Sequence, residues 1–298
     1  MISIIIPFYN EEDNVTKLAS EIAHEMRTPG LQYEMIFVDD GSTDQSKAQI
    51  KEEALNNQHI KVFSHRKRMG KGEALNTGIK HATGDIIVFM DADLQNDPKD
   101  LPKLLQKLDD GYDFVNGSRD KRSDHGLIKL YSNYANKFLR TFVHSPFADI
   151  NSAFKAMKRE VLEEITLYGN NFRFLPLAIY FKGFKVTEVE IHNRPRVHGQ
   201  SKFGVMKVFV GLFDTMTAYF LYRYAERPLI FFGSIGGFFF GAGVLIALYL
   251  SYERLFLNIL LYRRPALQLA ALLIIIGLQI IMTGFIGELI VYMNKRKK

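Results

Sequence analysis

Runs of apolar residues alternate with segments of helical periodicity through the first 120 residues of the chain. The runs are rich in Ile, Val and Phe, which is typical of strands covered on both faces. They span residues 2–8, 33–40, 60–65, 85–93 and 112–119. Strands that alternate with helices over short links predict an α/β fold with a doubly wound, mostly parallel sheet.

Helices are predicted in three of the intervening segments. Apolar side chains recur at helical spacing over residues 15–26, between the first two strands. A second helix is predicted over residues 73–82, after two glycines. A third is predicted over residues 98–108, with Asp97 as its cap and Pro98 in its first turn. Each helix would connect two strands, as a parallel sheet requires.

Polar clusters follow four of the predicted strands. They read "YNEE" (9–12), "DDGSTD" (39–44), "DADLQ" (91–95) and "GSRD" (117–120). The carboxyl ends of parallel strands meet at one edge of a sheet, and ligands of such sheets bind beyond that edge. The sequence therefore predicts a ligand site built from these four clusters.

Asp91, Asp93 and Gln95 stand at every second position after a buried strand. In an extended chain such positions share one side, so their oxygen atoms would converge. Three oxygen ligands without His or Cys suit a hard divalent cation, Mg²⁺ or Mn²⁺. The alternative is that these acids only solvate a strand end and cap the next helix. We favour that alternative for Asp97, and the metal for the other three.

The clusters at 9–12 and 39–44 offer contacts for a nucleotide. Asp39 and Asp40 point opposite ways in an extended chain, so at most one faces the ligand while the other braces the turn. Tyr9 offers a stacking surface, and Glu11 a hydrogen-bond acceptor for a base or ribose. Taken alone, the cluster at 9–12 is equally compatible with a helix start capped by Asn10.

The last seventy residues contain two long uncharged stretches, 229–250 and 265–287. Each exceeds the roughly 20 residues needed to cross a bilayer core, which predicts a transmembrane hairpin with spans at about 229–250 and 266–290. The alternative is a pair of buried helices in a soluble protein. Six basic residues flank the hairpin and three lie in its loop. This asymmetry predicts a multi-pass protein of the plasma (inner) membrane with the N-terminal α/β domain on the cytoplasmic side.

The predicted domain organisation has three parts. Residues 1–203 form the α/β domain, 204–227 form interfacial helices, and 228–298 form the hairpin. Gly233, Gly237 and Gly241 form a small-xxx-small face on the first span. Such a face favours close helix packing, either within the hairpin or between copies in a homo-oligomer.

Composition narrows the partners. The chain has no cysteine, which fits a reducing compartment and excludes disulfides and thiolate metal sites. Its net charge of +6 is explained more simply by anionic lipid head groups and a phosphorylated ligand than by nucleic acid. We expect a membrane partner and no nucleic acid.

The ordered motifs "SIIIPFYNEE", "VDDGSTD", "RMGKGEALNTGIKHATGD" and "DADLQ" resemble glycosyltransferase family 2 with its GT-A fold. The tail "RPRVHGQSKFG" (194–204), followed by a hairpin, is similar to the polyisoprenyl-phosphate branch. That branch comprises dolichyl-phosphate mannose synthase-like enzymes and bacterial undecaprenyl-phosphate sugar transferases. The resemblance covers residues 1–204 closely and the membrane part only in its layout.

The resemblance implies roles for particular residues. It implies catalytic roles for Asp91, Asp93 and Arg119, and a metal bound by Asp91, Asp93 and Gln95. The implied nucleotide-binding residues are Pro7, Tyr9, Glu11, Asp39, Asp40 and Asp91. The implied phosphate-binding residues are Arg119, Lys129, Ser132, Arg196 and Lys202. This chain departs from the branch at Lys129, where an Arg is common, and lacks an Asn that often opens the glycine motif.

The chemistry of the acceptor can be argued independently. A phosphomonoester has a second pKa of about 6, so at neutral pH it is an oxyanion that attacks without a general base. The site must then hold two anionic reactants together and neutralise the departing diphosphate. Together with the donor and acceptor classes that the resemblance implies, this predicts inverting transfer of a hexosyl unit from a UDP- or GDP-linked sugar to undecaprenyl or dolichyl phosphate.

Two alternatives remain at this stage. A membrane-anchored nucleotide-sugar sensor would bind the donor without transfer, but a decayed site would be expected to lose its metal ligands first. A processive polysaccharide synthase would need a Gln-x-x-Arg-Trp motif, and the chain contains no Trp. The basic tail has its own alternative, a loop lying on anionic lipid. His192 and His198 are expected to be packing or polar surface residues.

Overall fold

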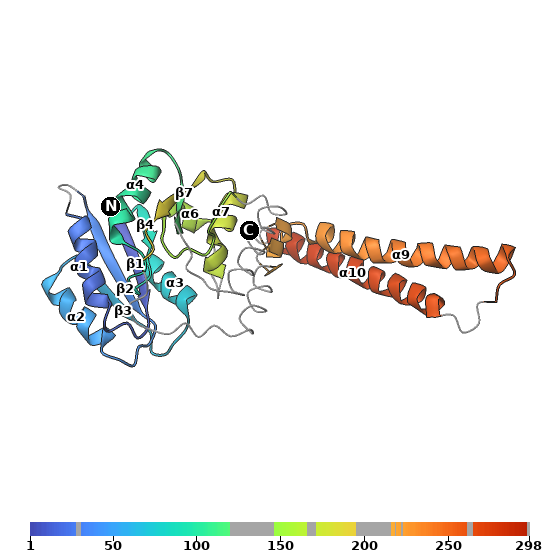
Figure 1. Cartoon of the computed structure of the whole chain (residues 1–298), viewed down its shortest axis with the longest axis horizontal. Coiled ribbons are helices and arrows are strands. Elements are labelled where there is room, and N and C mark those ends of the chain that lie inside the picture. Colours follow the sequence, from blue (N-terminus) through green and yellow to red (C-terminus); the bar gives the residue numbers. More distant parts are fainter. Residues whose placement is uncertain are drawn as a thin grey trace. The chain divides into compact units, whose positions relative to one another are not determined.

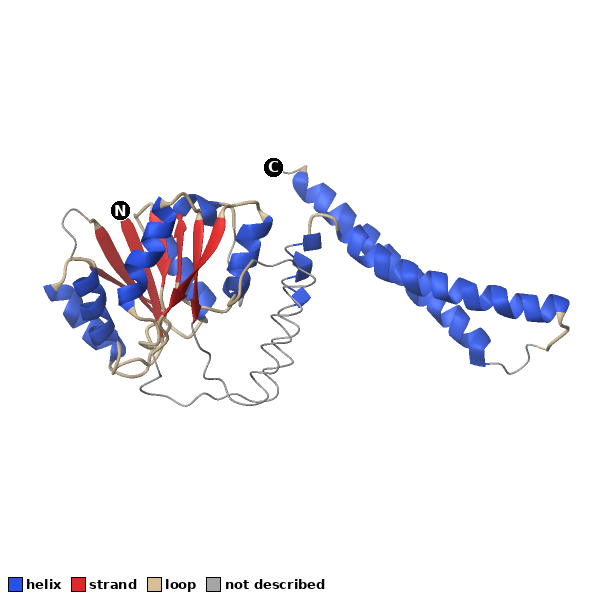
Figure 2. Ribbon diagram, turned by 45° about the horizontal axis from the view of Figure 1, so that its top comes forward, coloured by secondary structure: helices blue, strands red, loops and turns tan. Residues whose placement is uncertain are grey.

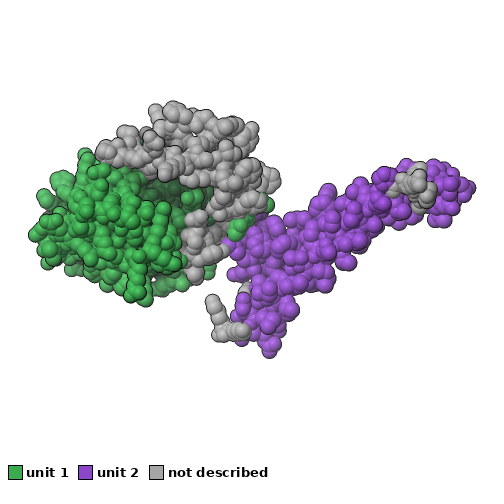
Figure 3. Space-filling model, turned by 90° about the horizontal axis from the view of Figure 1, so that it is seen from below, with its two compact units in different colours: residues 1–218 green, residues 219–298 purple. Residues whose placement is uncertain are grey.

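The computed structural model describes residues 1–27, 31–119, 146–165, 171–194, 216–217, 219–221, 223–260 and 265–296. Within them the chain divides into two units, Met1–Ala218 and Tyr219–Lys298 (Figure 3). The first contains the mixed α/β domain, and the second contains two long helices (Figure 1).

All five strands predicted from the apolar runs form. They are β1 (Ile2–Phe8), β2 (Tyr33–Asp39), β3 (Ile60–Ser64), β4 (Ile86–Phe89) and β5 (Phe114–Arg119). Two further strands complete the sheet, β6 (Lys155–Lys158) and β7 (Val186–Ile191). The order is β3-β2-β1-β4-β6-β5-β7, and β6 alone in this sheet runs antiparallel to its neighbours. The mostly parallel sheet is confirmed.

Helices cover both faces of the sheet (Figure 2). They are α1 (Val15–Glu25), α2 (Ser46–Asn56), α3 (Lys71–His81), α4 (Leu101–Asp109), α6 (Arg159–Glu163) and α7 (Leu175–Phe181), with the 3-10 turns η1 (Pro98–Asp100) and η2 (Asn171–Phe174). One core joins α1 and α4 to alternate residues of β1, β2 and β4. On the other face Gly78 of α3 lies against Ile5. Asp97 caps η1 by accepting a hydrogen bond from the Lys99 amide at 3.0 Å, as predicted.

Strand register brings the polar clusters together. β1 is buried along all seven residues and lies between β2 and β4. Phe8 is paired with Asp39, and Ile5 with Phe89. Because these strands are parallel, the residues that follow β1, β2 and β4 leave the sheet at the same edge. The predicted edge site is therefore sterically possible.

The opposite end of the sheet is held by a buried carboxylate, Glu34. It accepts hydrogen bonds from Ser3 Oγ at 2.6 Å and from the amide and hydroxyl of Thr83 at 2.7 and 2.8 Å. Lys61 Nζ lies 2.7 Å from its second oxygen. Burial alone would raise the pKa of Glu34, but these partners outweigh it and lower the pKa to about 2.

We predict that Glu34→Gln lowers the free energy of unfolding by roughly 2 kcal/mol at neutral pH, because the ion pair and a charge-assisted hydrogen bond are lost. The folded pKa lies below the ordinary value of 4.5. The stabilisation is therefore fully present above that value and disappears as the pH falls toward about 2. Denaturant titrations of both proteins at several pH values check this. A difference that is the same at pH 7 and near pH 2 would contradict it.

The second unit is built from α9 (Pro228–Phe256) and α10 (Pro265–Lys295). Both are long and apolar enough to cross a membrane. In the most apolar 18-residue stretch of each helix, only 11% of the residues of α9 and 17% of those of α10 are buried. Core helices of a soluble protein would be covered, so the hairpin interpretation is favoured over that alternative. The proposed interfacial helices of residues 204–227 fall largely outside the described residues and stay a prediction.

The helices of the hairpin touch through glycines, but through a different set from the predicted face. A Cβ on Gly277 would lie 2.5 Å from the Phe240 amide nitrogen, and one on Gly236 would lie 2.6 Å from the Gly277 oxygen. Among the described residues, a Cβ on Gly237 or Gly241 would meet nothing within 4 Å. The predicted small-xxx-small face therefore does not form the contact within the hairpin.

Candidate functional site

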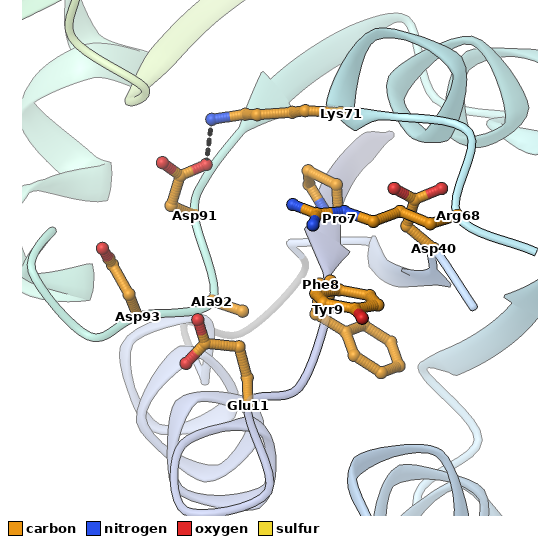
Figure 4. Close-up of a pocket in the computed structure, with 10 residues that line it drawn as sticks. All are labelled: Pro7, Phe8, Tyr9, Glu11, Asp40, Arg68, Lys71, Asp91, Ala92 and Asp93. Carbon is orange, nitrogen blue, oxygen red and sulfur yellow. Dashed lines mark hydrogen bonds and ion pairs between the residues drawn. The ribbon is translucent and has the colours of Figure 1, made fainter. Parts of the chain in front are cut away.

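A pocket of about 360 Å³ opens at the carboxyl edge of the sheet (Figure 4). It is lined by Pro7, Phe8, Tyr9, Glu11, Asp40, Arg68, Lys71, Asp91, Ala92 and Asp93. These residues come from the ends of β1 and β2, from the loop before α3 and its first residue, and from the loop after β4. Six residues that the sequence marked for nucleotide or metal binding thus share one cavity.

Asp39 and Asp40 divide their tasks as predicted for a pair pointing opposite ways. Asp40 lines the pocket, and its carboxylate accepts hydrogen bonds from the amides of Met69 at 2.8 Å and Gly70 at 2.9 Å. Asp39 is buried and does not line the pocket. It accepts a bond from the Ser42 amide at 2.7 Å, which closes the turn after β2. Asp40 therefore also holds the basic loop beside the cavity.

The loop after β4 presents two of its three predicted metal ligands. Asp91 and Asp93 line the pocket, whereas Gln95 does not. The reason is local: Leu94 has a φ of 58°, so the backbone is not extended past Asp93. The two-residue alternation of side chains holds only in extended chain. The backbone N–H of Gln95 donates a hydrogen bond to Asp93 Oδ1 at 3.2 Å.

The charges of the lining suit a divalent cation. Four carboxylates and two cationic side chains give a formal charge of −2. Figure 4 shows Asp91, Asp93 and Glu11 on one side and Arg68 with Tyr9 on the other. In the part of the chain that the structure describes, no group of three His, Cys, Asp or Glu is close enough to hold a metal by itself. Asp91 and Asp93 would hold a hard cation and leave positions open for a ligand's oxygens.

Comparisons with known proteins assign the family. The model of the family described as Glycosyl transferase family 2 matches residues 3–166. The chain belongs to glycosyl transferase family 2. It is 31% identical over 298 residues to a protein named dodecaprenyl-phosphate galacturonate synthase from Rhizobium johnstonii, an alignment covering 97% of this chain and 87% of the relative. The resemblance to the polyisoprenyl-phosphate branch is thereby confirmed.

Solved structures confirm the GT-A fold of this family 2 member. Glucosyl-3-phosphoglycerate synthase from Mycobacterium tuberculosis, in complex with phosphoglyceric acid, is similar with a TM-score of 0.59 and 23% identity, covering 73% of this chain and 79% of that one. The same enzyme in complex with Mn²⁺ and UDP-glucose gives a TM-score of 0.58 at 23% identity, covering 74% and 78%.

Arg119, predicted to bind phosphate, lies at the end of β5 but does not line the pocket. Its guanidinium forms a bidentate ion pair with Asp149, with distances of 2.6 and 3.1 Å. Asp149 lies in the segment before β6. Glu188 of β7 holds this segment by accepting hydrogen bonds from the backbone amides of Ala148 at 2.6 Å and Asp149 at 3.2 Å. The other predicted phosphate-binding residues, Lys129, Ser132, Arg196 and Lys202, lie outside the described residues.

Lys155 of β6 is buried in this family 2 domain, close enough to the pocket residues Lys71 and Asp91 to interact with their charges, and sequence reasoning missed it. Its ammonium contacts the backbone oxygen of Ser152. Burial is the main cause that lowers the pKa of Lys155 to about 7; nearby Lys71 acts in the same direction, while Asp149 and Asp91 partly offset both effects. Nothing local in "FKAMK" indicates that Lys155 is buried beside these charges, because its neighbours come from other segments of the chain.

The segment that follows β7 fastens the loop that follows β4. The Arg194 amide bonds to the Gln95 carbonyl at 2.9 Å, and its guanidinium pairs with Asp97 at 2.7 Å and Glu21 at 2.6 Å. Arg194 opens the tail motif "RPRVHGQSKFG". His192 is a surface residue that contacts buried Asp100, as expected of a polar packing residue. His198 lies outside the described residues.

The basic loop before α3 and the first residue of that helix supply two pocket residues that sequence reasoning did not assign. The Arg68 guanidinium lies over the Tyr9 ring, 4.2 Å from its centroid. Lys71 forms an ion pair with Asp91. The signal was present in "RMGKG", whose basic residues flank the glycine turn. The positions of Arg68 and Lys71 depend on Asp40, which follows β2 and accepts hydrogen bonds from the backbone amides of the turn between them.

Proposed function

We propose that this chain transfers a hexosyl unit, with inversion, from a nucleotide diphosphate sugar to a polyprenyl phosphate. The observation that carries the proposal is the pocket itself, in which Asp91 and Asp93 face cationic Arg68 and Lys71 beside an aromatic ring. The named activity of the Rhizobium relative supports a polyprenyl-phosphate acceptor, because the alignment runs through both the domain and the hairpin.

The donor would occupy the pocket. Tyr9 offers the stacking face for a base, and Glu11 and Asp40 offer acceptors for a base or ribose. Mg²⁺ or Mn²⁺, held by Asp91 and Asp93, would neutralise the departing diphosphate. The neighbour of the same fold that was crystallised with Mn²⁺ and UDP-glucose is compatible with this arrangement. The roles of Asp39 and Gln95 stay predictions, since neither lines the pocket.

The acceptor phosphate would approach as an oxyanion and attack without a general base. Arg119, oriented by Asp149, is the described residue that we assign to a phosphate group. Lys129, Ser132, Arg196 and Lys202 join this set on sequence grounds alone. The hairpin would keep residues 1–203 at the cytoplasmic surface of the plasma membrane, with residues 204–227 lying in the interface. We also include in this proposal that copies of the chain associate as a homo-oligomer.

The test uses the purified full chain in lipid nanodiscs with Mn²⁺ and a panel of UDP- and GDP-linked sugars, including UDP-galacturonate and UDP-glucose. We expect release of nucleoside diphosphate with one of these donors, and only when both undecaprenyl phosphate and the cation are present. Mass spectrometry should detect the matching lipid-linked sugar. Donor binding without transfer for the entire panel would favour the sensor and reject the proposed activity.

A further inference from the structure

Lys71 occupies a position that a cofactor would also use. It is the first residue of α3 and reaches across the pocket to Asp91, with which it forms an ion pair (Figure 4). Both side chains are 31% exposed, so the pair is neither locked in the core nor fully in water. The preceding Gly70 has a φ of 100°, and its amide donates to Asp40 at 2.9 Å. This turn directs the lysine into the pocket.

The ion pair conflicts with cation binding. A divalent cation on Asp91 would stand close to the Lys71 ammonium, and two positive charges at that distance repel. Lys71 must therefore leave Asp91 for the cation to bind there. Its long side chain and partial exposure allow this movement.

The donor would give Lys71 a new partner. A nucleotide diphosphate sugar carries two negative charges next to the cation that it accompanies, so its phosphate oxygens would lie within the same pocket as the Lys71 ammonium. Lysine binds phosphate as a compact point charge and does not need a particular geometry. Binding of the donor would then remove the competitor from Asp91.

We propose that Lys71 is an internal counterion that competes with the divalent cation for Asp91 and is taken over by the donor diphosphate. The cation and the nucleotide consequently bind with positive coupling, because each favours the same position of the lysine. This inference rests on the proposed function, since it requires the cation and the donor to share the pocket.

The test measures Mn²⁺ binding to the full chain from the electron paramagnetic resonance signal of free Mn²⁺, first alone and then with saturating UDP or GDP. We expect Lys71→Met to bind Mn²⁺ alone about fivefold more tightly than wild type. The gain in Mn²⁺ affinity produced by the nucleotide should shrink in this variant. Lys71→Arg, which keeps the charge, should retain most of the coupling.

Lys107→Met is the matched control, because Lys107 pairs with Asp110 on α4 and does not line the pocket. It should leave Mn²⁺ binding unchanged. If Lys71→Met binds Mn²⁺ with the same affinity as the wild type or more weakly, the inference is overturned. The proposed sugar transfer is tested separately by its own assay and is not affected by that result. Wild type that binds no Mn²⁺, with or without nucleotide, overturns the inference together with the metal assignment. Tighter binding by Lys71→Met in a protein that transfers no sugar would uphold the inference and reject the transfer.

Discussion

Asp93→Ala is expected to leave the protein folded in membranes while reducing sugar transfer by at least roughly 100-fold. Asp93 lines the pocket and is partly exposed, so truncating it leaves the hydrophobic core intact. The variant would remove one of the two carboxylates that we assign to the cation. The departing diphosphate would then lose much of the charge that stabilises it.

Transfer is measured as formation of the lipid-linked sugar over a range of Mn²⁺ concentrations. Asp110→Ala is the matched control, since this exposed carboxylate at the end of α4 pairs only locally with Lys107. The control should keep wild-type turnover. Near-normal turnover of Asp93→Ala at low Mn²⁺ would remove Asp93 from the metal site. Equal membrane levels and denaturation curves for the two variants would show that folding is not the cause.

Gly277→Leu is expected to separate the two helices of the hairpin. A Cβ at this position would lie 2.5 Å from the Phe240 nitrogen and 2.7 Å from the Gly236 oxygen, both backbone atoms that cannot move aside singly. Overpacking of this kind costs roughly 1–3 kcal/mol. Small residues permit the close approach that stabilises helix pairs in lipid, so much of the contact would be lost.

Cross-linking can read out this separation, because the chain contains no cysteine of its own. A Cβ on Gly284 would lie 3.0 Å from the Phe232 Cβ, so cysteines at these two positions should form a disulfide on mild oxidation. Gly277→Leu should slow that reaction strongly. Gly237→Leu, on the face that meets no described residue within 4 Å, should not. Equal cross-linking of both variants would contradict the observed packing.

The strands that the sequence predicted well are those whose apolar runs are buried on both sides. β1 spans the predicted residues 2–8, and its seven residues are all buried. β6 and β7 gave no such signal. β6 is four residues long with a lysine at each end, and most of β7 is only partly buried. Their side chains pack against partners distant in sequence, so local periodicity does not reveal them.

In the site, as in the sheet, the sequence predicted some residues and missed others. The spacing of Asp91 and Asp93, two positions apart shortly after β4, was sufficient to predict that both line one cavity. Gln95 does not line the cavity, because Leu94 adopts a left-handed conformation that turns the backbone before it. Lys71 and Asp149 became visible only through ion pairs with Asp91 and Arg119, which lie 20 and 30 positions away in the chain.

The sequence by itself determined the α/β sheet, the apolar hairpin, the family and the acidic loop that ends β4, because each is written in local periodicity or in an ordered motif. Only the tertiary structure decided which aspartate at the end of β2 faces the pocket, which glycines join α9 to α10, and which lysine opposes Asp91. These depend on strand register and on the close approach of distant segments, and both are settled by packing of the whole chain.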